Sequence, residues 1–283
     1  MSVRGNSGFV DTDKRFGSSS GDTKGIIQRE QQFLERTQGR FEPVSNELAP
    51  AENPTAWYDA DSTYITLNGS DVSQWDDKSG NDIHMSQSTT SAQPPYSSSN
   101  SSLNNLPSVD AANNQWMESS DNALLDTSTT GGFTVYVVAV KNSQPSTFAF
   151  LCGRTNTTTW SQGWGIFLYS GNIRFFVNNW NSSATRAETT IPANGSTSIY
   201  KMHYDETTIT AEIIGDGADS GTQAYSTPVT DTTGTEGLLL NAGNSTAYDG
   251  DFDFGEYIFY NRPLTADEQT ETENYLKNKF NIS

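Results

Sequence analysis

The feature that most constrains the fold is a series of short runs of β-forming residues, which begins near residue 56 and continues almost to the C-terminus. The runs are rich in Val, Ile, Tyr, Phe, Trp and Thr, and clusters of Gly, Asn, Asp and Ser separate them. The predicted strands are residues 56–60, 64–67, 72–75, 133–140, 148–152, 163–169, 172–177, 199–204, 209–214, 237–241 and 254–260. Short strands at this spacing predict an all-β fold in which two antiparallel sheets pack as a sandwich.

The last twenty residues have a different pattern. Thr265 is a good N-cap residue, and Glu268 three positions later completes a capping box, so the pattern predicts a helix over residues 266–279. We expect four apolar residues around this helix to dock on the sandwich. They are Leu264, Tyr275, Leu276 and Phe280.

Two polar segments are predicted to be connections. Residues 86–108 are rich in Ser, Thr, Asn and Gln, and we expect them to form a long surface loop. Residues 215–221, GDGADSG, lack the lysine and the following helix of a phosphate-binding loop, so we expect the tip of a hairpin.

The N-terminal segment differs in charge from the rest. Residues 1–43 hold seven Lys or Arg and six Asp or Glu, whereas the remainder holds nine and 28, a net charge of -19. Residues 1–52 are too polar to form a core, so we expect an extended arm with one short helix over residues 26–37 and a separate sandwich domain over residues 53–283. The residues expected to anchor the arm in a partner are Phe9, Phe16, Ile26, Ile27, Phe33 and Leu34.

Composition excludes several functions. The formal net charge of -18 repels nucleic-acid phosphates and anionic lipids, so neither nucleic acid nor a membrane is expected as a partner. Cys152 is the one cysteine and lies in an apolar run, which indicates a buried residue. The N-terminus has no apolar export signal, so we expect synthesis in a cytoplasm without a standard export route.

Sugar binding requires accessible aromatic rings beside amide or carboxylate groups. Trp160 and Trp180 fall in predicted loops, and Asn178 and Asn179 precede the second of them. These four residues are the candidate glycan contacts. Trp164 shares one side of its strand with Ile166 and Leu168, so we expect it in the core.

Two acidic segments offer oxygen ligands to calcium. One contains Asp249, Asp251 and Asp253, and the other contains Asp76 and Asp77. Neither has the spacing of an EF-hand loop. Calcium binding and simple solvation of turn residues are both compatible with this pattern, and no cofactor is required.

Several of these segments resemble the concanavalin A-like lectin and glucanase superfamily, and specifically its LamG-like jelly-roll domains. The most specific are WDDKSGND, at residues 75–82, and the last strand, turn and helix, with Glu256, Tyr260, Asn261, Arg262 and Leu264 at typical positions. The resemblance covers residues 53–283 and implies a curved jelly-roll sandwich. It also implies carbohydrate or calcium binding in many relatives.

The resemblance also bears on catalysis. Retaining glucanases of this superfamily place two glutamates around an aspartate on one strand, whereas this chain has Asp251, Asp253 and Glu256. In the family pattern Phe254, Glu256, Ile258 and Tyr260 form one side of the closing strand, and the preceding aspartates belong to a turn. We therefore expect no enzymatic activity.

The arm resembles, over about 45 residues, the N-terminal segments of virion structural proteins of tailed bacteriophages. This implies a virion protein whose residues 1–43 bind other capsid or tail proteins. Its sandwich would then decorate the particle or bind a host-surface glycan, in several copies. The alternatives are a bacterial carbohydrate-binding or adhesion module and, third, a glucan hydrolase.

Overall fold

The computed structural model describes residues 49–112, 114–144, 148–156, 159–230, 236–241 and 250–283. The predicted arm helix at residues 26–37 lies outside these residues. The predicted anchoring residues lie outside them as well, namely Phe9, Phe16, Ile26, Ile27, Phe33 and Leu34.

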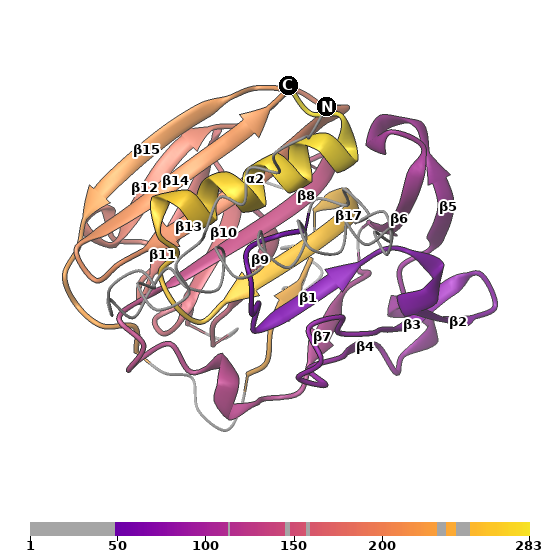
Figure 1. Cartoon of the computed structure of the whole chain (residues 1–283), viewed down its shortest axis with the longest axis horizontal. Coiled ribbons are helices and arrows are strands. Elements are labelled where there is room, and N and C mark those ends of the chain that lie inside the picture. The colour runs from indigo at the N-terminus through magenta and orange to yellow at the C-terminus, as the bar shows by residue number, and fades with distance from the viewer. Residues whose placement is uncertain (1–48, 113, 145–147, 157–158, 231–235, 242–249) are drawn as a thin grey trace, which may run out of the picture. The chain divides into compact units, whose positions relative to one another are not determined.

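The described residues form strands and one α-helix, α2, at Ala266–Phe280 (Figure 1). The strands are β1 Ala56–Asp59, β2 Ile65–Asn68, β3 Asp71–Trp75, β4 Met85–Ser86, β5 Tyr96–Asn100, β6 Leu106–Ala111, β7 Met117–Ser119, β8 Phe133–Ser143, β9 Phe148–Arg154, β10 Trp164–Tyr169, β11 Asn172–Val177, β12 Arg186–Thr190, β13 Ser196–Tyr204, β14 Thr208–Gly215, β15 Asp219–Ala224, β16 Leu239–Leu240 and β17 Asp251–Tyr260. The turn between β14 and β15 is the hairpin tip predicted for residues 215–221.

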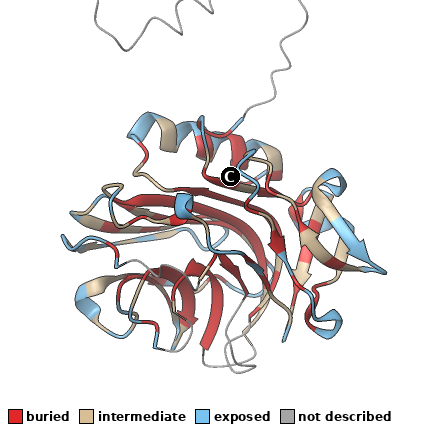
Figure 2. Cartoon of the chain, turned by 90° about the horizontal axis from the view of Figure 1, so that it is seen from below, coloured by how far each residue is buried: buried red, intermediate tan, exposed pale blue. Residues whose placement is uncertain are grey.

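The described strands form two sheets, in which neighbouring strands pair antiparallel. Sheet A has the order β15-β14-β13-β8-β17-β6-β5, and β1 also pairs with β17, beyond the end of β6. Sheet B has the order β12-β11-β10-β9-β16-β7-β4-β3-β2. The sheets face one another across a buried layer (Figure 2), which confirms the predicted two-sheet sandwich.

The core lies between the two sheets because alternate side chains of each strand point inward. On β8, for example, Val135, Val137 and Ala139 belong to this core. Trp164 stacks on Phe133 with ring centroids 4.8 Å apart, so its predicted core position is confirmed. Cys152 is also buried there, as predicted, and burial raises the pKa of its thiol well above the usual value.

Helix α2 packs on the outer face of sheet A (Figure 2). Its predicted capping box is confirmed: Thr265 accepts a hydrogen bond from the Glu268 N–H, and the Glu268 carboxylate accepts one from the Thr265 N–H. The four predicted docking residues are buried against the sheet, namely Leu264, Tyr275, Leu276 and Phe280. Within the described residues, no helix has the length and apolar character needed to span a bilayer.

A bulge in β17 corrects the predicted register of this strand. The pairing of β17 with β8 shifts between Phe254 and Glu256, so Phe254 faces the core whereas Glu256 faces outward, toward α2. The prediction that the two share one side was therefore wrong. Gly255 occupies the bulge because a Cβ atom there would lie 2.6 Å from the Phe280 ring. Asp251 and Asp253 lie in the strand rather than in the preceding turn, which is a second correction.

Some strands were not predicted because their sequences are polar. Residues 86–108 do not form a continuous loop as predicted, since they contain β5 and the start of β6. Strand β5 is an edge strand with the sequence YSSSN, and β12 and β15, RAETT and DSGTQA, are also edge strands. Backbone hydrogen bonds to one neighbour hold such strands, so they need few apolar side chains.

Candidate functional site

The outer face of sheet B carries a cluster of aromatic side chains. Phe148 and Phe150 of β9, Phe167 of β10 and Phe176 of β11 belong to one cluster on this face. Their neighbours in sequence, such as Ala149 and Ile166, point into the central core. Alternation along three adjacent strands therefore builds an aromatic layer on the side of sheet B that faces away from sheet A.

Gly165 makes room for this layer. It lies on β10 opposite Gly153 of β9, and a Cβ atom on Gly165 would lie 2.7 Å from the Phe176 ring and 3.1 Å from the Phe150 ring. The pair of glycines therefore lets the two phenylalanine rings lie close against the backbone of the sheet.

Two loops bring tryptophans to the same layer. The Trp160 ring centroid lies 5.5 Å from that of Phe148 and 4.9 Å from that of Phe150. The Trp180 ring lies 5.1 Å from Phe148 and 5.7 Å from Tyr169, in both cases edge to face. The two loops are joined by a hydrogen bond from the Trp180 N–H to the Trp160 carbonyl. The fold thus brings both predicted tryptophans into one cluster.

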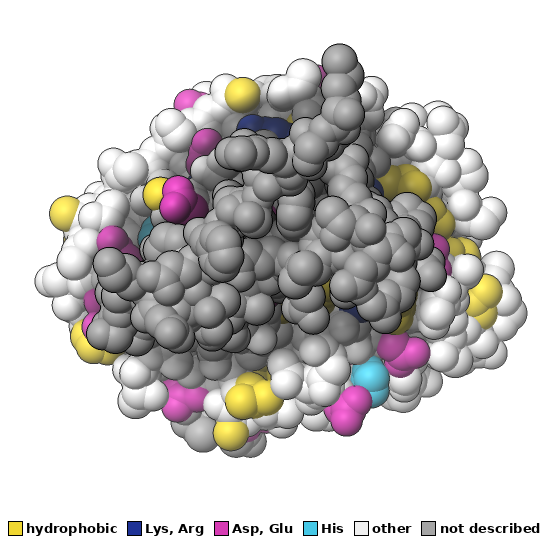
Figure 3. All heavy atoms as spheres, in the orientation of Figure 1, with side chains coloured by type: hydrophobic (Ala, Val, Ile, Leu, Met, Phe, Trp, Pro, Cys, Tyr) yellow, Lys and Arg dark blue, Asp and Glu magenta, His cyan; other side chains and the backbone are white. Residues whose placement is uncertain are grey.

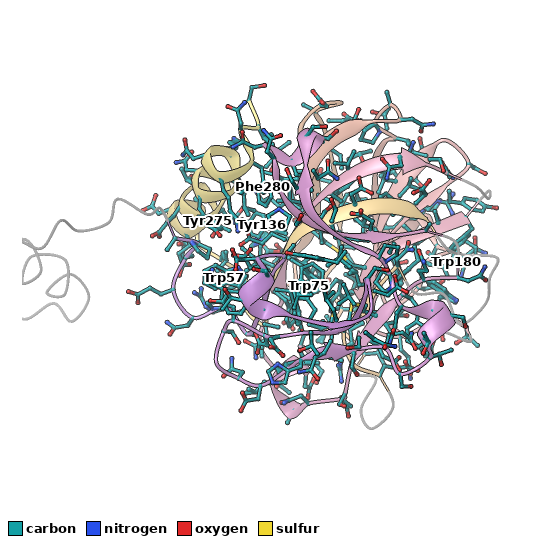
Figure 4. The ribbon with its side chains drawn as sticks, turned by 90° about the vertical axis from the view of Figure 1, so that its right-hand side faces the viewer. Trp57, Trp75, Tyr136, Trp180, Tyr275 and Phe280 are labelled. Atoms are coloured by element: carbon teal, nitrogen blue, oxygen red, sulfur yellow. The ribbon has the colours of Figure 1, made fainter. Side chains whose placement is uncertain are left out.

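Exposure separates the two tryptophans. Trp160 is only 5% exposed, which argues against the prediction that it stacks on a sugar, because its ring faces are used for packing. Trp180 and Tyr169 are partly exposed and can be reached from solvent. Figure 4 shows Trp180 on the opposite side of the sandwich from Trp57, Tyr275 and Phe280, which lie near α2.

A row of polar side chains borders Trp180 and Tyr169. The Arg174 guanidinium lies over the Tyr169 ring, 4.4 Å from its centroid. Glu188 Oε1 lies 2.9 Å from Arg174 Nε and 2.6 Å from Arg186 Nε, and Glu188 Oε2 accepts a hydrogen bond from Asn172. Pairing of β11 with β12 places Arg174 directly opposite Glu188. We call this surface the Trp180 patch, defined as Tyr169, Asn172, Arg174, Trp180, Arg186 and Glu188.

The charges of the patch are coupled. Burial lowers the pKa of Arg174, and the neighbouring Arg186 lowers it further. Burial would raise the pKa of Glu188, but hydrogen bonds and charge from Arg186 and Arg174 outweigh it and hold that pKa below its usual range. Two cations and one anion leave the patch with an excess positive charge, in a chain with a formal charge of -18.

The two asparagines predicted to contact a glycan differ in exposure: Asn178 is buried and Asn179 is exposed. Asn178 is 8% exposed, its amide donates to the Tyr225 hydroxyl and the Pro228 carbonyl, and its Oδ1 accepts from the Thr230 N–H. Its polar atoms are therefore used in holding the loop, which argues against a role in reading a sugar. Asn179 is exposed next to Trp180, and its Oδ1 accepts from the Asn181 N–H.

The predicted calcium ligands Asp251 and Asp253 lie on the outer face of sheet A. Asp253 Oδ1 accepts from the Asn142 amide at 2.6 Å, and Asp253 Oδ2 accepts from the Asn100 amide at 2.7 Å. Asp251 Oδ2 accepts from the Ser143 hydroxyl. Asp249 lies outside the described residues. Among the residues that the structure describes, no group of three acidic, histidine or cysteine side chains is placed to hold a metal ion.

The second predicted calcium pair accepts hydrogen bonds from other groups of the protein. Asp77 accepts hydrogen bonds from the N–H groups of Trp57, Ser79 and Ile83. Asp76 accepts from the Gln74 amide. Asp77 therefore organises the WDDKSGND segment and has little capacity left for an ion.

Asp110 is a neighbour of Asp253 that sequence patterns did not reveal. It lies on β6 directly opposite Asp253 of β17. Burial raises the pKa of Asp110 to about 6; the Ser108 hydroxyl opposes this, and Asp253 and Asp251 add to it. The two segments are far apart in the sequence, so only strand pairing brings these carboxylates together.

A third cluster of charges lies under α2. Glu256 is completely buried, and its carboxylate accepts hydrogen bonds from the Trp57 indole at 2.6 Å, the Tyr275 hydroxyl at 2.8 Å and the Lys279 ammonium at 2.8 Å. Lys279 also lies 2.8 Å from Asp59 Oδ2, which in turn pairs with Lys78. Burial raises the pKa of Glu256 in spite of Lys279. The helix seals this carboxylate, so it serves docking of α2.

The sequence matches no family model and no curated protein. Among solved structures, the chain is similar to the binding domain of Paraclostridial Mosquitocidal Protein 1, with a TM-score of 0.55, 13% identity and coverage of 79% of this chain and 52% of that one. It is similar to an arabinofuranosidase complexed with arabinofuranosyl-alpha-1,2-xylobiose, with a TM-score of 0.55, 15% identity and coverage of 74% and 51%.

The binding domain of Botulinum Neurotoxin DC in complex with SialylT is also similar, with a TM-score of 0.52, 8% identity and coverage of 80% and 52%. The chain thus spans about half the length of the solved structures it matches. At these identities the likeness concerns the fold, and it confirms the predicted jelly-roll sandwich.

Proposed function

We propose that the sandwich is a carbohydrate-binding module and that the Trp180 patch is its sugar-contacting surface. The observation that carries this proposal is the pairing of two accessible aromatic rings, Trp180 and Tyr169, with a row of polar groups from Asn172, Arg174 and Glu188 on one sheet face. Aromatic rings pack on the apolar faces of pyranoses, and the polar row is suited to hydrogen bonding with hydroxyl groups.

The structural comparisons support this class of function at the level of fold. Two of the similar structures, the arabinofuranosidase and the neurotoxin binding domain, are described as complexes with a saccharide or a sialyl compound. For this chain, sugar binding without hydrolysis is the proposal, because Glu256 is sealed under α2 and both oxygens of Asp253 are engaged by amides.

A hydrolase is the second candidate, and one observation favours it. A general acid needs a pKa near the working pH, and Asp110, with a pKa of about 6, lies opposite Asp253 on the adjacent strand. Release of reducing sugar that is lost in Asp110→Asn but kept in Trp180→Ala would favour this function over simple binding.

The virion role predicted from the arm remains a prediction. It depends on residues 1–43, which lie outside the described residues, and the solved structures named above include no virion protein. Partners in a particle, several copies per particle and a location in the virion are therefore expectations of the sequence. Incorporation into particles of a chain lacking residues 1–43 would contradict them.

Binding of the purified protein to an immobilised panel of neutral and acidic oligosaccharides tests the proposed function. We expect Trp180→Ala to weaken binding at least about tenfold, which is the effect of losing about 1.4 kcal/mol of ring packing. Trp180→Phe keeps a ring and should retain part of the affinity. Leu67→Ala, at an exposed apolar residue on β2, is the matched control and should change nothing.

Melting temperatures of the variants separate binding from folding, because Trp180 also packs on Phe148 and Phe167. Folded Trp180→Ala protein that binds sugar as well as the unchanged chain would place the site elsewhere. Absence of binding to any member of the panel would argue against a carbohydrate-binding module.

A further inference from the structure

Arg174 is held in place while part of its guanidinium stays available. Its side chain is 12% exposed, its Cζ lies over the Tyr169 ring, and its Nε lies 2.9 Å from Glu188. Among the residues that the structure describes, Nη1 and Nη2 have no hydrogen-bond partner. Nε is buried and lies close to Glu188 without a hydrogen bond of good geometry, whereas Nη1 and Nη2 are not among the buried atoms that lack a partner. The two terminal nitrogens therefore reach solvent.

The other charged groups of the patch are engaged, wholly or in part, by hydrogen bonds and ion pairs within the protein. Glu188 uses Oε1 for Arg174 and Arg186 and Oε2 for Asn172. Arg186 donates from Nη1 to the Trp180 carbonyl, so it holds the loop that carries the indole ring. The excess positive charge of the patch therefore lies beside Tyr169 and Trp180.

This positive charge is unusual for the molecule. The chain has 34 acidic and 16 basic residues, and Figure 3 shows Asp and Glu side chains scattered over the visible described surface of one face, with few Lys or Arg. A rigid guanidinium fork presents two parallel N–H donors, which match the two oxygens of a carboxylate better than they match a hydroxyl group.

We infer that the Trp180 patch selects sugars that carry a carboxylate, with Arg174 Nη1 and Nη2 pairing with the carboxylate and Trp180 packing against the sugar ring. The inference rests on the proposed function and specifies its ligand class. Stacking on Tyr169 and pairing with Glu188 hold the fork in one orientation before the ligand arrives, which reduces the entropy lost on binding.

The test compares each acidic sugar with its own neutral methyl ester. The probes are 3′-sialyllactose, tri-galacturonate and their methyl esters, with lactose as an uncharged reference, and binding to the full chain is measured by titration calorimetry. We expect at least one acid to bind about tenfold more tightly than its ester, and the ratio to fall as salt is added.

Three variants assign the selectivity to Arg174. Arg174→Met should reduce the ratio of acid to ester affinity to about one, and Arg174→Lys should keep only part of it because an ammonium lacks the fork. Lys277→Met, on α2 at the other sheet, removes the same charge and should leave the ratio unchanged. If Arg174→Met does not fold, Arg174→Lys still shows whether the selectivity depends on the two parallel donors of the guanidinium or on the positive charge alone.

The outcomes separate this inference from the proposed function. Equal binding of acid and ester, lost in Trp180→Ala, would overturn the selectivity while leaving the sugar site intact. Selectivity for acids that survives in both Arg174 variants would place the carboxylate elsewhere and also overturn it. Absence of binding to the acids, the esters and the whole sugar panel would overturn both.

Discussion

At the scale of single residues, the fold holds some carboxylates ionised and drives others, such as Asp110, toward their neutral form. Hydrogen bonds from Arg262 hold the pKa of Glu268 at about 2. Burial would raise the pKa of Asp59, but Lys279 and Lys78 outweigh it and lower that pKa. Asp110 has no such cation, and burial beside Asp253 and Asp251 raises its pKa to about 6.

Asp110→Asn should therefore stabilise the protein near pH 7.5 by about 1 kcal/mol, after solvent screening of this half-exposed side chain. A folded-state pKa above the unfolded value means that the stability from protonated Asp110 is present below about pH 4 and is lost as the pH rises through about 6. The gain from the substitution should accordingly vanish near pH 4. Urea unfolding at both pH values measures it.

Asp82→Asn is the control for this prediction, because the Asp82 side chain is 90% exposed, and it should change stability little at either pH. Equal destabilisation by Asp110→Asn at both pH values would instead mean that the hydrogen bond from Ser108 outweighs the cost of the buried charge.

At the scale of elements, α2 is attached to sheet A by two different kinds of contact. Its capping box and its apolar residues could be predicted because both depend on residues close in the sequence. The charged contact could not be predicted, because Lys279 forms ion pairs with Asp59 of β1 and Glu256 of β17, which are not its neighbours in the sequence. The ammonium lies between two carboxylates in a region with little water.

Lys279→Met should destabilise the sandwich by about 3 kcal/mol, because it leaves Glu256 and Asp59 as neighbouring buried carboxylates without their shared cation. Lys277 lies on the same helix and, among the described residues, pairs only with Glu273 at 3.9 Å, so Lys277→Met should cost less than about 0.5 kcal/mol. Guanidinium unfolding of the two variants makes the comparison. Adding Glu256→Gln to Lys279→Met should recover part of the loss.

Equal stability of the two lysine variants would mean that Lys78 alone neutralises the cluster. Lys78 lies 2.9 Å from Asp59 and over the Trp57 ring, so Asp59 would then keep a cation partner.

At the scale of the whole molecule, the residues described between 49 and 283 form an apolar core between two sheets. Two smaller clusters lie on the outer faces: one joins α2 to sheet A, and the other contains Trp160 and Trp180 on sheet B. The proposed sugar surface and the helix therefore lie on opposite sides of the sandwich (Figure 4).

A chain that begins at residue 49 should fold and melt within about 2 °C of the full chain, because the described residues of the sandwich already bury a large apolar core between two sheets. Its sugar affinity should also be unchanged. Differential scanning calorimetry of both chains, with the sugar panel as a second measurement, checks this. Loss of the cooperative transition in the shorter chain would show that the arm contributes to the fold of the sandwich.

The sequence by itself determined the sandwich class, most apolar strands, the capped terminal helix and the core positions of Trp164 and Cys152. These depend on local alternation and capping, which are written in neighbouring residues. Only the tertiary structure decided that Trp160 is buried while Trp180 is reachable, and that Asp110 faces Asp253. It also decided the faces of β17, since a bulge of one residue exchanges inward and outward positions. These features depend on pairing between strands that are distant in the sequence, and local sequence patterns do not indicate which strands become neighbours.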